Sequence, residues 1–195
     1  MINTKKLRLC VGVVVLSLFM TGCASPYLIK KKQKTLVLKQ NEGVALFSCK
    51  FRDKDKPTEK NIFNFASIGL QENNQYKAYK QKQIFLIPLS GENYVKQDDL
   101  FLFSLKLPKG TYRVTNLNGV FRVLFGSQYF ASINKLFDVL PGQVSYAGRV
   151  CVDFFVSKGR KHELKVEDQF AEDKNRFKNG YPALQNQTIV KDLIY

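Results

Sequence analysis

A cysteine directly follows an apolar stretch near the start of the chain, and its thiol is the first side chain suited to covalent chemistry. Residues 9–20 are apolar apart from one glycine and one serine, three basic residues precede them, and Thr21, Gly22 and Cys23 follow. A basic start, an apolar run of this length and small residues at its end are the parts of an export signal. The run is short of the roughly 20 apolar residues that a membrane-spanning helix needs. The pattern therefore predicts a removable signal over residues 1–22.

The last four residues of this segment, Met20-Thr21-Gly22-Cys23, resemble the lipobox of bacterial lipoproteins. The resemblance implies that the chain is cut between Gly22 and Cys23 and that the thiol of Cys23 carries a diacylglyceryl group, with no other cofactor. More than one acyl chain gives stable membrane anchoring. No aspartate follows the cysteine, which in bacteria that sort lipoproteins by that position implies the outer membrane, on its periplasmic side. An ordinary signal peptide with a chance cysteine is the alternative.

The charge of the chain is strongly basic, +15 in total. Residues 1–22 hold three of the 31 basic residues and none of the 16 acidic ones, so the mature chain keeps a net charge of +12. An exported protein meets phospholipid headgroups or cell-wall polyanions rather than nucleic acid, so we expect no nucleic-acid partner. The densest basic run lies just beyond the anchor and consists of Lys30, Lys31, Lys32 and Lys34. Such lysines contribute about 1 kcal/mol each beside anionic lipid, which predicts contact with the membrane surface; a solvated linker is the alternative.

Two cysteines, Cys49 and Cys151, remain after the signal is removed and Cys23 is modified. An oxidising compartment permits a disulfide between them. Alternation along the chain places Cys49 beside Phe47 on a buried face, whereas Cys151 shares with Arg149 and Asp153 a face that we expect to be more exposed. A disulfide and two separate thiols are both open at this point.

The candidates for acid–base catalysis are few. His162 is the only histidine, and with Leu164 and Val166 on its face we expect a half-buried strand residue rather than a base. A Ser-His-Asp triad would need it, but no serine lies in a G-x-S-x-G motif. Clustered Cys and His ligands for zinc are absent from the sequence as well.

Two groups of carboxylates are candidates for calcium binding or acid–base chemistry. Asp98-Asp99 precedes an expected strand. The second group begins an expected helix, where acids favour the helix dipole, and it consists of Glu167, Asp168, Glu172 and Asp173. We expect both groups to be solvated surface.

A polar segment mixes tyrosine with lysine and suits contact with sugars, polyanions or another protein. Its residues are Tyr76, Lys77, Tyr79, Lys80 and Lys82. A loop with incidental aromatic residues is the alternative.

The elements that position these residues follow a period of two over most of the chain, which indicates β-strands. We expect strands over residues 34–39, 43–51, 61–70, 82–89, 119–125, 129–137 and 160–166. Two further stretches combine strands with Pro-Gly turn chemistry and predict hairpins: residues 100–117 around Pro108-Lys109-Gly110, and residues 137–156 around Pro141-Gly142. Short strands with frequent turns predict a mainly β fold, a single antiparallel β-sandwich.

The tail changes period, and we expect two short helices over 167–182 and 188–195, with Asp168 as the N-cap of the first. The predicted organisation is a signal over 1–22, a lipid-anchored linker over 23–33, a sandwich over 34–166 and a helical tail over 167–195 that packs on the sandwich. The strands around the two turns resemble those of transthyretin-like and carboxypeptidase-regulatory-like sandwiches in bacterial lipoproteins, over residues 80–156.

The sequence as a whole predicts a membrane-anchored, non-catalytic binding or assembly module of the cell envelope, with an envelope protein or the cell wall as its partner. One alternative is a cell-wall or lipid hydrolase that uses His162 or a carboxylate such as Asp99. Another is a carrier whose phenylalanines line a pocket for a small apolar ligand.

Overall fold

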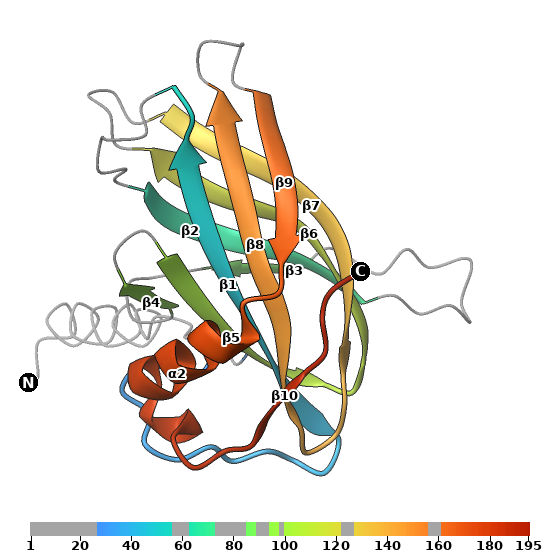
Figure 1. The fold of residues 1–195 in the computed structure, drawn as a ribbon. Coiled ribbons are helices and arrows are strands. Elements are labelled where there is room, and N and C mark those ends of the chain that lie inside the picture. The colour runs from blue at the N-terminus through green and yellow to red at the C-terminus, as the bar shows by residue number, and fades with distance from the viewer. Residues whose placement is uncertain are drawn as a thin grey trace, which may run out of the picture.

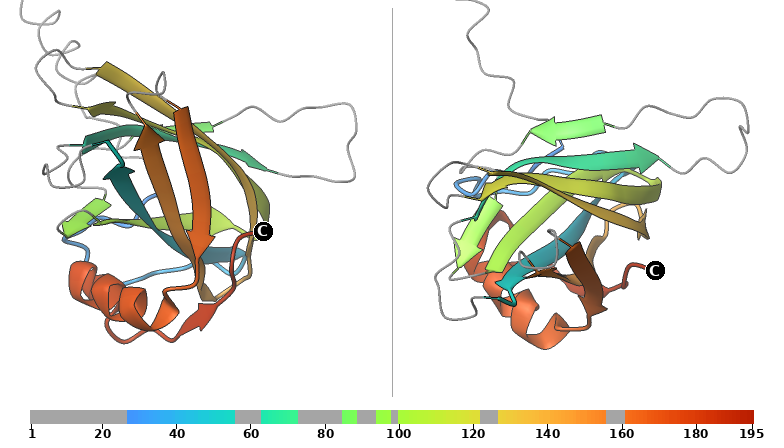
Figure 2. Two further views of the ribbon diagram at one scale, coloured as in Figure 1. Left: turned by 45° about the horizontal axis from the view of Figure 1, so that its top comes forward. Right: turned by 90° about the horizontal axis from the view of Figure 1, so that it is seen from above.

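The computed structural model describes residues 27–55, 63–72, 85–88, 94–97, 100–121, 127–155 and 161–195. Two β-sheets pack face to face, and one helix lies against the outer face of the first sheet (Figures 1 and 2). Sheet A contains β1 (Glu42–Asp53), β4 (Tyr94–Gln97), β5 (Leu100–Pro108), β8 (Val144–Phe155), β9 (Lys161–Glu167) and β10 (Ile189–Lys191). Sheet B contains β2 (Phe63–Glu72), β3 (Phe85–Pro88), β6 (Gly110–Phe121) and β7 (Ser127–Val139). The helix is α2 (Phe170–Gly180), and the short 3-10 helix η1 (Pro182–Leu184) follows it.

The predicted fold class is confirmed: the chain is mainly β and forms a two-sheet sandwich with a helix near its C-terminus. The strand order is β10-β8-β1-β5-β4 in sheet A, with β9 also paired to β8, and β3-β2-β6-β7 in sheet B. Most pairs are antiparallel, but β8 runs parallel to both β1 and β10. Strands expected over 43–51, 61–70, 82–89 and 160–166 are present as β1, β2, β3 and β9.

Both predicted hairpins are wrong, because each turn carries the chain from one sheet to the other. β5 pairs with β1 and β4 in sheet A, whereas β6 pairs with β2 and β7 in sheet B, so Lys109 lies at a corner. The turn from β7 to β8 is a second corner from sheet B back to sheet A. Gly142, in this second turn, has a φ of 70°, the positive value that glycine adopts readily in turns. Among the described strands, β6 pairs antiparallel with β7, and β8 pairs antiparallel with β9.

The main core lies between the two sheets and is rich in aromatic side chains. Phe47 and Phe103 stack with ring centroids 5.0 Å apart, and Tyr112 stacks on Phe137 at 5.7 Å. Burial of apolar surface stabilises a fold by about 25 cal/mol per Å². The fully buried members from sheet A include Ala45, Phe47, Cys49, Phe51, Phe101, Phe103, Leu105, Val150 and Val152; those from sheet B include Ile68, Leu70, Val114, Leu117, Ala131 and Phe137.

A second core lies between α2 and the outer face of sheet A, the face that points away from sheet B. Because side chains alternate along a strand, β1 sends Phe47 inward and Leu46 outward, and both are buried. α2 covers this outer face with Phe177, and Tyr181 packs beside it with its hydroxyl donating to the carbonyl of Leu102 at 2.7 Å. A strand buried on both faces reads as a continuous apolar run, which is what residues 44–47 show.

The predicted linker over 23–33 and the strand predicted over 34–39 both need correction. Within the described part of that linker, the Lys106 N–H donates to the Tyr27 carbonyl at 2.7 Å and the Ile29 N–H donates to the Ser104 carbonyl at 3.1 Å, so the chain joins the edge of β5. Leu28 is also buried. Residues 34–39, all described, form no strand but still alternate: Leu36 and Leu38 pack against the outer core, while Val37 is 70% exposed.

The second predicted helix, over 188–195, is wrong. Residues 189–191 form β10, parallel to β8. The chain then crosses the open side of the sandwich: the Ile194 N–H donates to the Ala147 carbonyl of sheet A at 2.8 Å, and Tyr195 exchanges backbone hydrogen bonds with Leu136 of sheet B. Ile194 enters the main core. These contacts with both sheets outweigh the local preference for a helix.

Candidate functional site

The predicted lipidation and cleavage residues, Cys23 and Gly22, lie outside the described residues. Tyr27, the first described residue, is four positions after Cys23 and is already bound to β5. The basic run that follows is exposed at each of Lys30, Lys31, Lys32 and Lys34. Its contact with a membrane surface therefore stays a prediction.

The thiols of Cys49 and Cys151 are both free and both buried. Cys49 is opposite Val150 and Cys151 is opposite Lys50, so the two side chains point to opposite faces of sheet A. Because a disulfide requires Cβ atoms that face each other, the candidate bridge does not form. Cys49 lies in the main core as expected, but Cys151 is 1% exposed, so the greater exposure expected for it is wrong.

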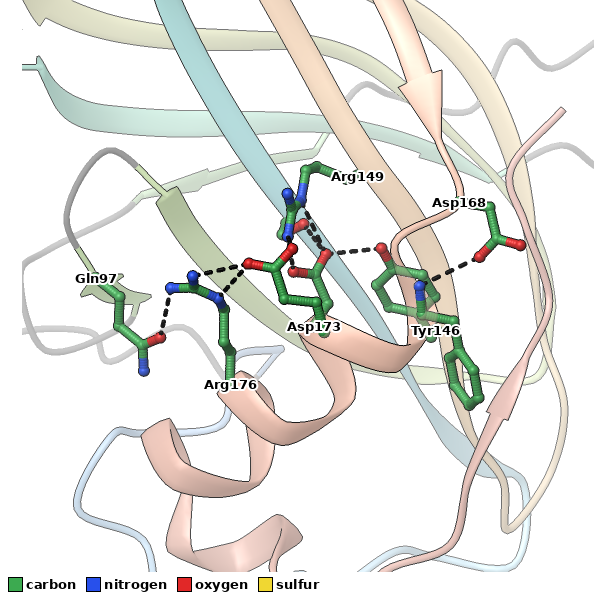
Figure 3. A network of polar contacts seen from close by, with 9 residues as sticks. Gln97, Tyr146, Arg149, Asp168, Asp173 and Arg176 are labelled. Atoms are coloured by element: carbon green, nitrogen blue, oxygen red, sulfur yellow. Dashed lines mark hydrogen bonds and ion pairs between the residues drawn. The ribbon is translucent and has the colours of Figure 1, made fainter.

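The most elaborate polar arrangement in the described chain centres on Asp173 of α2, which is fully buried (Figure 3). Its carboxylate accepts hydrogen bonds from the Ser48 hydroxyl at 2.5 Å and from the Tyr146 hydroxyl at 2.7 Å. The guanidinium of Arg149 donates to the same carboxylate from Nε at 3.3 Å and also from Nη2. This cluster ties α2 to both central strands, β1 and β8. The solvated position expected for Asp173 is therefore wrong.

The electrostatics of this cluster keep Arg149 charged and Tyr146 neutral. Burial by itself lowers the pKa of Arg149, but the bonds to Asp173 and Glu172 outweigh it, so the pKa is raised. Burial, followed by the hydrogen bond to Asp173, raises the pKa of Tyr146 above its ordinary value. Removing either partner of a buried charge pair of this kind leaves an uncompensated charge, which strongly destabilises the fold.

An exposed rim continues the network along α2. Glu172 bonds to Arg149 at 3.0 Å and to Nη2 of Arg176 at 2.8 Å, and Arg176 donates to Gln97 of β4 at 3.4 Å (Figure 3). The hydrogen bond from Arg176, with that from Arg149, lowers the pKa of Glu172. Its side chain is 46% exposed, so these charges remain accessible to a partner.

Beyond Arg149, no described element covers the outer face of sheet A (Figure 1). The register of β1, β8 and β9 places charged side chains on this face. Arg52 pairs with the buried Asp153 at 2.5 Å, and Lys54 joins the same carboxylate at 3.3 Å. The thiol of Cys151 lies beneath this layer; burial and then Glu167 raise its pKa to about 11. We call this surface the outer charged face; its accessible members are Lys50, Arg52, Lys54, Glu163, Lys165 and Glu167.

The other candidates for chemistry are dispersed. His162 is half-buried in β9, as expected. Asp168 is not the N-cap of α2, a position that Gln169 occupies, but its carboxylate accepts the Phe170 N–H at 3.2 Å. Lys191 bonds to Asp168 at 3.0 Å, and this contact, with the Phe170 N–H, lowers the pKa of Asp168. Asp98 and Asp99, and the segment over 76–82, lie outside the described residues. Among the residues that are described, no group of three or more acidic, Cys or His side chains is placed to hold a metal ion.

The sequence does contain a signal for the burial of Asp173. Asp173 is three residues after Phe170 and four before Phe177, so all three share one helical stripe. An acidic residue on an apolar stripe needs a buried partner. Arg149, Cys151 and Asp153 alternate along β8, but strict alternation would put Tyr146 on the other face; the register shift after Tyr146 brings it to the outer face with Arg149.

No family model and no curated protein matches the chain. A leucine-rich repeat protein from Bacteroides thetaiotaomicron is a distant structural neighbour, with a TM-score of 0.36 and 14% identity. The match covers 73% of this chain but only 16% of the neighbour. In the described part of the chain, no helix is both long and apolar enough to span a membrane.

Proposed function

We propose that the chain is an envelope lipoprotein, anchored by lipid on Cys23 to the outer membrane on its periplasmic side, and that it acts as a non-catalytic binding or assembly module. The anchoring rests on the basic start, the apolar run and the lipobox resemblance that ends at Cys23. The early start of the folded domain supports it, because Tyr27 is bound to β5 only four positions later.

The outer charged face carries the binding role. It is a strand surface that carries charges of both signs, basic along β1 and alternating along β9, and the buried Asp173–Arg149 pair marks its lower boundary. Complementary charges give a protein interface specificity and a fast association rate. Mixed signs favour a protein partner over a polyanion. The phenylalanines that a carrier would need for its pocket include Phe47 and Phe103, which instead stack on each other.

Anchoring is tested by growing cells with labelled palmitate and comparing wild type with Cys23→Ser. We expect label on the wild-type chain and none on the variant. Label that persists on Cys23→Ser would contradict the anchoring.

The binding role is tested by cross-linking in intact cells, followed by mass spectrometry of the membrane fraction. We expect defined envelope proteins with wild type and their loss with Lys54→Glu/Lys165→Glu, which reverses two exposed charges of the outer charged face. Arg113→Glu, on the outer side of sheet B, is the matched control and should keep the cross-links. Equal loss in both variants, or no defined partner at all, would contradict an interface on this face.

A further inference from the structure

Three segments that are distant in the sequence meet at the lower end of the sandwich in Figure 1. The Lys109 N–H, at the corner after β5, donates to the Asn41 carbonyl at 2.6 Å. The Gly142 N–H, at the corner before β8, donates to the Glu42 carbonyl at 2.8 Å. A Cβ atom on Gly43 would lie only 2.2 Å from the Leu140 carbonyl oxygen, so the start of β1 is in close contact with the corner before β8. Residues 41–43 therefore join the two corners, and the segment that leads to them runs across the same end of the sandwich in Figure 1.

This end combines exposed apolar side chains with lysines. Val37 is 70% exposed and Leu140 is 44% exposed, and they are two of the four large apolar side chains that the described residues expose. Val37 cannot turn inward, because Leu36 and Leu38 on either side of it pack against the outer core. We call this surface the basal face and define it by Lys34, Val37, Lys39, Lys109 and Leu140.

The charge of the basal face is positive. Lys34, Lys39 and Lys109 are all exposed. Two half-buried acidic residues lie nearby. Glu42 accepts the Lys39 N–H at 2.9 Å and lies 3.8 Å from Nζ of Lys106. Asp138, opposite Thr111, accepts the Thr111 hydroxyl at 2.5 Å. Apolar tips surrounded by lysines are the composition of a surface that inserts at the boundary of an anionic bilayer.

The lipid anchor proposed at Cys23 would bring the basal face next to the membrane, because the tether is short. The backbone N–H of Lys106 donates to the Tyr27 carbonyl, and Lys106 is two residues before the end of β5 at this corner. The four-residue step from Cys23 to Tyr27 spans at most ~14 Å in any conformation. The far end of β8 is about 36 Å from its start at the basal end, at 3.3 Å per residue, so a short tether brings the basal end to the bilayer first.

We propose that the basal face docks on an anionic phospholipid bilayer, with Val37 and Leu140 at the acyl boundary and the three lysines among the headgroups. This inference rests on the proposed lipid anchor at Cys23. It gives the domain one orientation, with the strands of sheet A rising from the membrane. Arg52 and Lys54, at the far end of β1, are then displayed toward a partner at a distance from the bilayer. Each lysine near the surface contributes about fivefold to docking.

The chain contains no tryptophan, so a single introduced tryptophan reports on its own surroundings. The full-length lipidated protein is reconstituted into phosphatidylcholine vesicles with brominated acyl chains, with or without phosphatidylglycerol. Two variants, Val37→Trp and Leu140→Trp, place the tryptophan on the basal face. The control, Ser132→Trp, places it at an exposed site of β7, about 23 Å from the basal end of that strand. Circular dichroism checks that each is folded.

We expect the bromines to quench Val37→Trp and Leu140→Trp at least severalfold more than Ser132→Trp on vesicles that contain phosphatidylglycerol. Combining Val37→Trp with Lys34→Gln, Lys39→Gln and Lys109→Gln should reduce the quenching to the Ser132→Trp level, although the lipid still holds the protein on the vesicle. Equal quenching at all three sites of vesicle-bound protein would overturn the docking.

The lipid anchor is measured separately in the same samples. Flotation with neutral vesicles should be lost in Cys23→Ser; if it persists, the anchor assigned to Cys23 is wrong. The quenching pattern is read only from protein that floats, so it decides the orientation of the basal face whichever way the anchor experiment turns out.

Discussion

Replacing Asp173 by asparagine tests whether the buried charge pair holds α2 on sheet A. Asparagine preserves the shape of the side chain but removes its charge, and Arg149, only 8% exposed, then keeps only the partly exposed Glu172 as its acidic partner. The hydroxyls of Ser48 and Tyr146 also lose a charged acceptor. We therefore expect a large loss of stability, although only one carboxylate oxygen is replaced by an amide nitrogen.

The magnitude follows from the surroundings of the pair. Removing one partner of a buried ion pair costs about 3–5 kcal/mol, and the remaining contact with Glu172 favours the lower value, about 3 kcal/mol. That corresponds to a change of roughly 100-fold to 200-fold in the unfolding equilibrium constant. For a domain of this size the melting temperature should fall by about 6–12 °C. Ser48→Ala, which leaves the charge pair in place, should cost only about 1 kcal/mol.

Urea unfolding followed by circular dichroism measures these differences, with every variant in the same buffer as wild type. The double variant Asp173→Leu/Arg149→Met is the decisive control, because replacing both partners by apolar residues removes the uncompensated charge. It should be more stable than Asp173→Asn alone. If Asp173→Asn unfolds within about 0.5 kcal/mol of wild type, or if the double variant is the less stable of the two, the reasoning about the buried pair is refuted.

Three further predictions concern other parts of the fold. Gly148 has a φ of +116°, and an added Cβ would lie 3.1 Å from Val166, so Gly148→Ala should lower the free energy of unfolding by more than 1 kcal/mol; an unchanged urea midpoint would contradict this. Neither Cys49 nor Cys151 should react with a thiol reagent at pH 8 in the folded protein, because burial raises both pKa values, and both should react in denaturant; fast reaction of the native protein would show that the thiols are accessible. Burial, with Asp138 nearby, raises the pKa of Asp192, so its ionised form destabilises the fold once the pH is above the unfolded-state pKa. Asp192→Asn should therefore raise the free energy of unfolding by about a few tenths of a kcal/mol at pH 7 and leave it unchanged at pH 3. A stability gain at pH 3 in thermal unfolding would contradict the sign.

The strands themselves were predictable from the sequence, because alternation reports which residues face a core. β1 and β9 were expected close to where they lie. Leu36, Val37 and Leu38 alternate as well, but the strand predicted from them over 34–39 is wrong, because the same pattern arises whenever an extended segment packs on a surface. Alternation indicates burial on one side and says nothing about a hydrogen-bonded neighbour.

The pairing of strands was not predictable, because turn chemistry does not specify which sheet the next strand joins. Pro108-Lys109-Gly110 is a good turn for a hairpin and an equally good corner between two sheets. The parallel pairing of β1 with β8 depends on contacts about 100 residues apart, such as Leu46 with Tyr146. Local patterns carry no information about such contacts.

The candidate site was predicted only in part for a related reason. Acidic residues near the start of a helix are usually solvated, and Glu172 follows that rule, being 46% exposed. Asp173 departs from it because three donors from β1 and β8 converge on its carboxylate. Those donors are adjacent only after sheet A has formed.

The central position of β1 has a consequence for the time that the chain takes to fold. Leu46 lies opposite Ser104 on one side and Tyr146 on the other, so β1 acquires both neighbours from segments made much later. Folds dominated by such distant pairings form in milliseconds to seconds, far more slowly than helical bundles. During that interval the apolar stretch over 44–47 stays open to solvent and to other unpaired strands. For the export that we propose, this delay leaves the polypeptide unfolded long enough to cross a membrane, and during it β1 is open to aggregation.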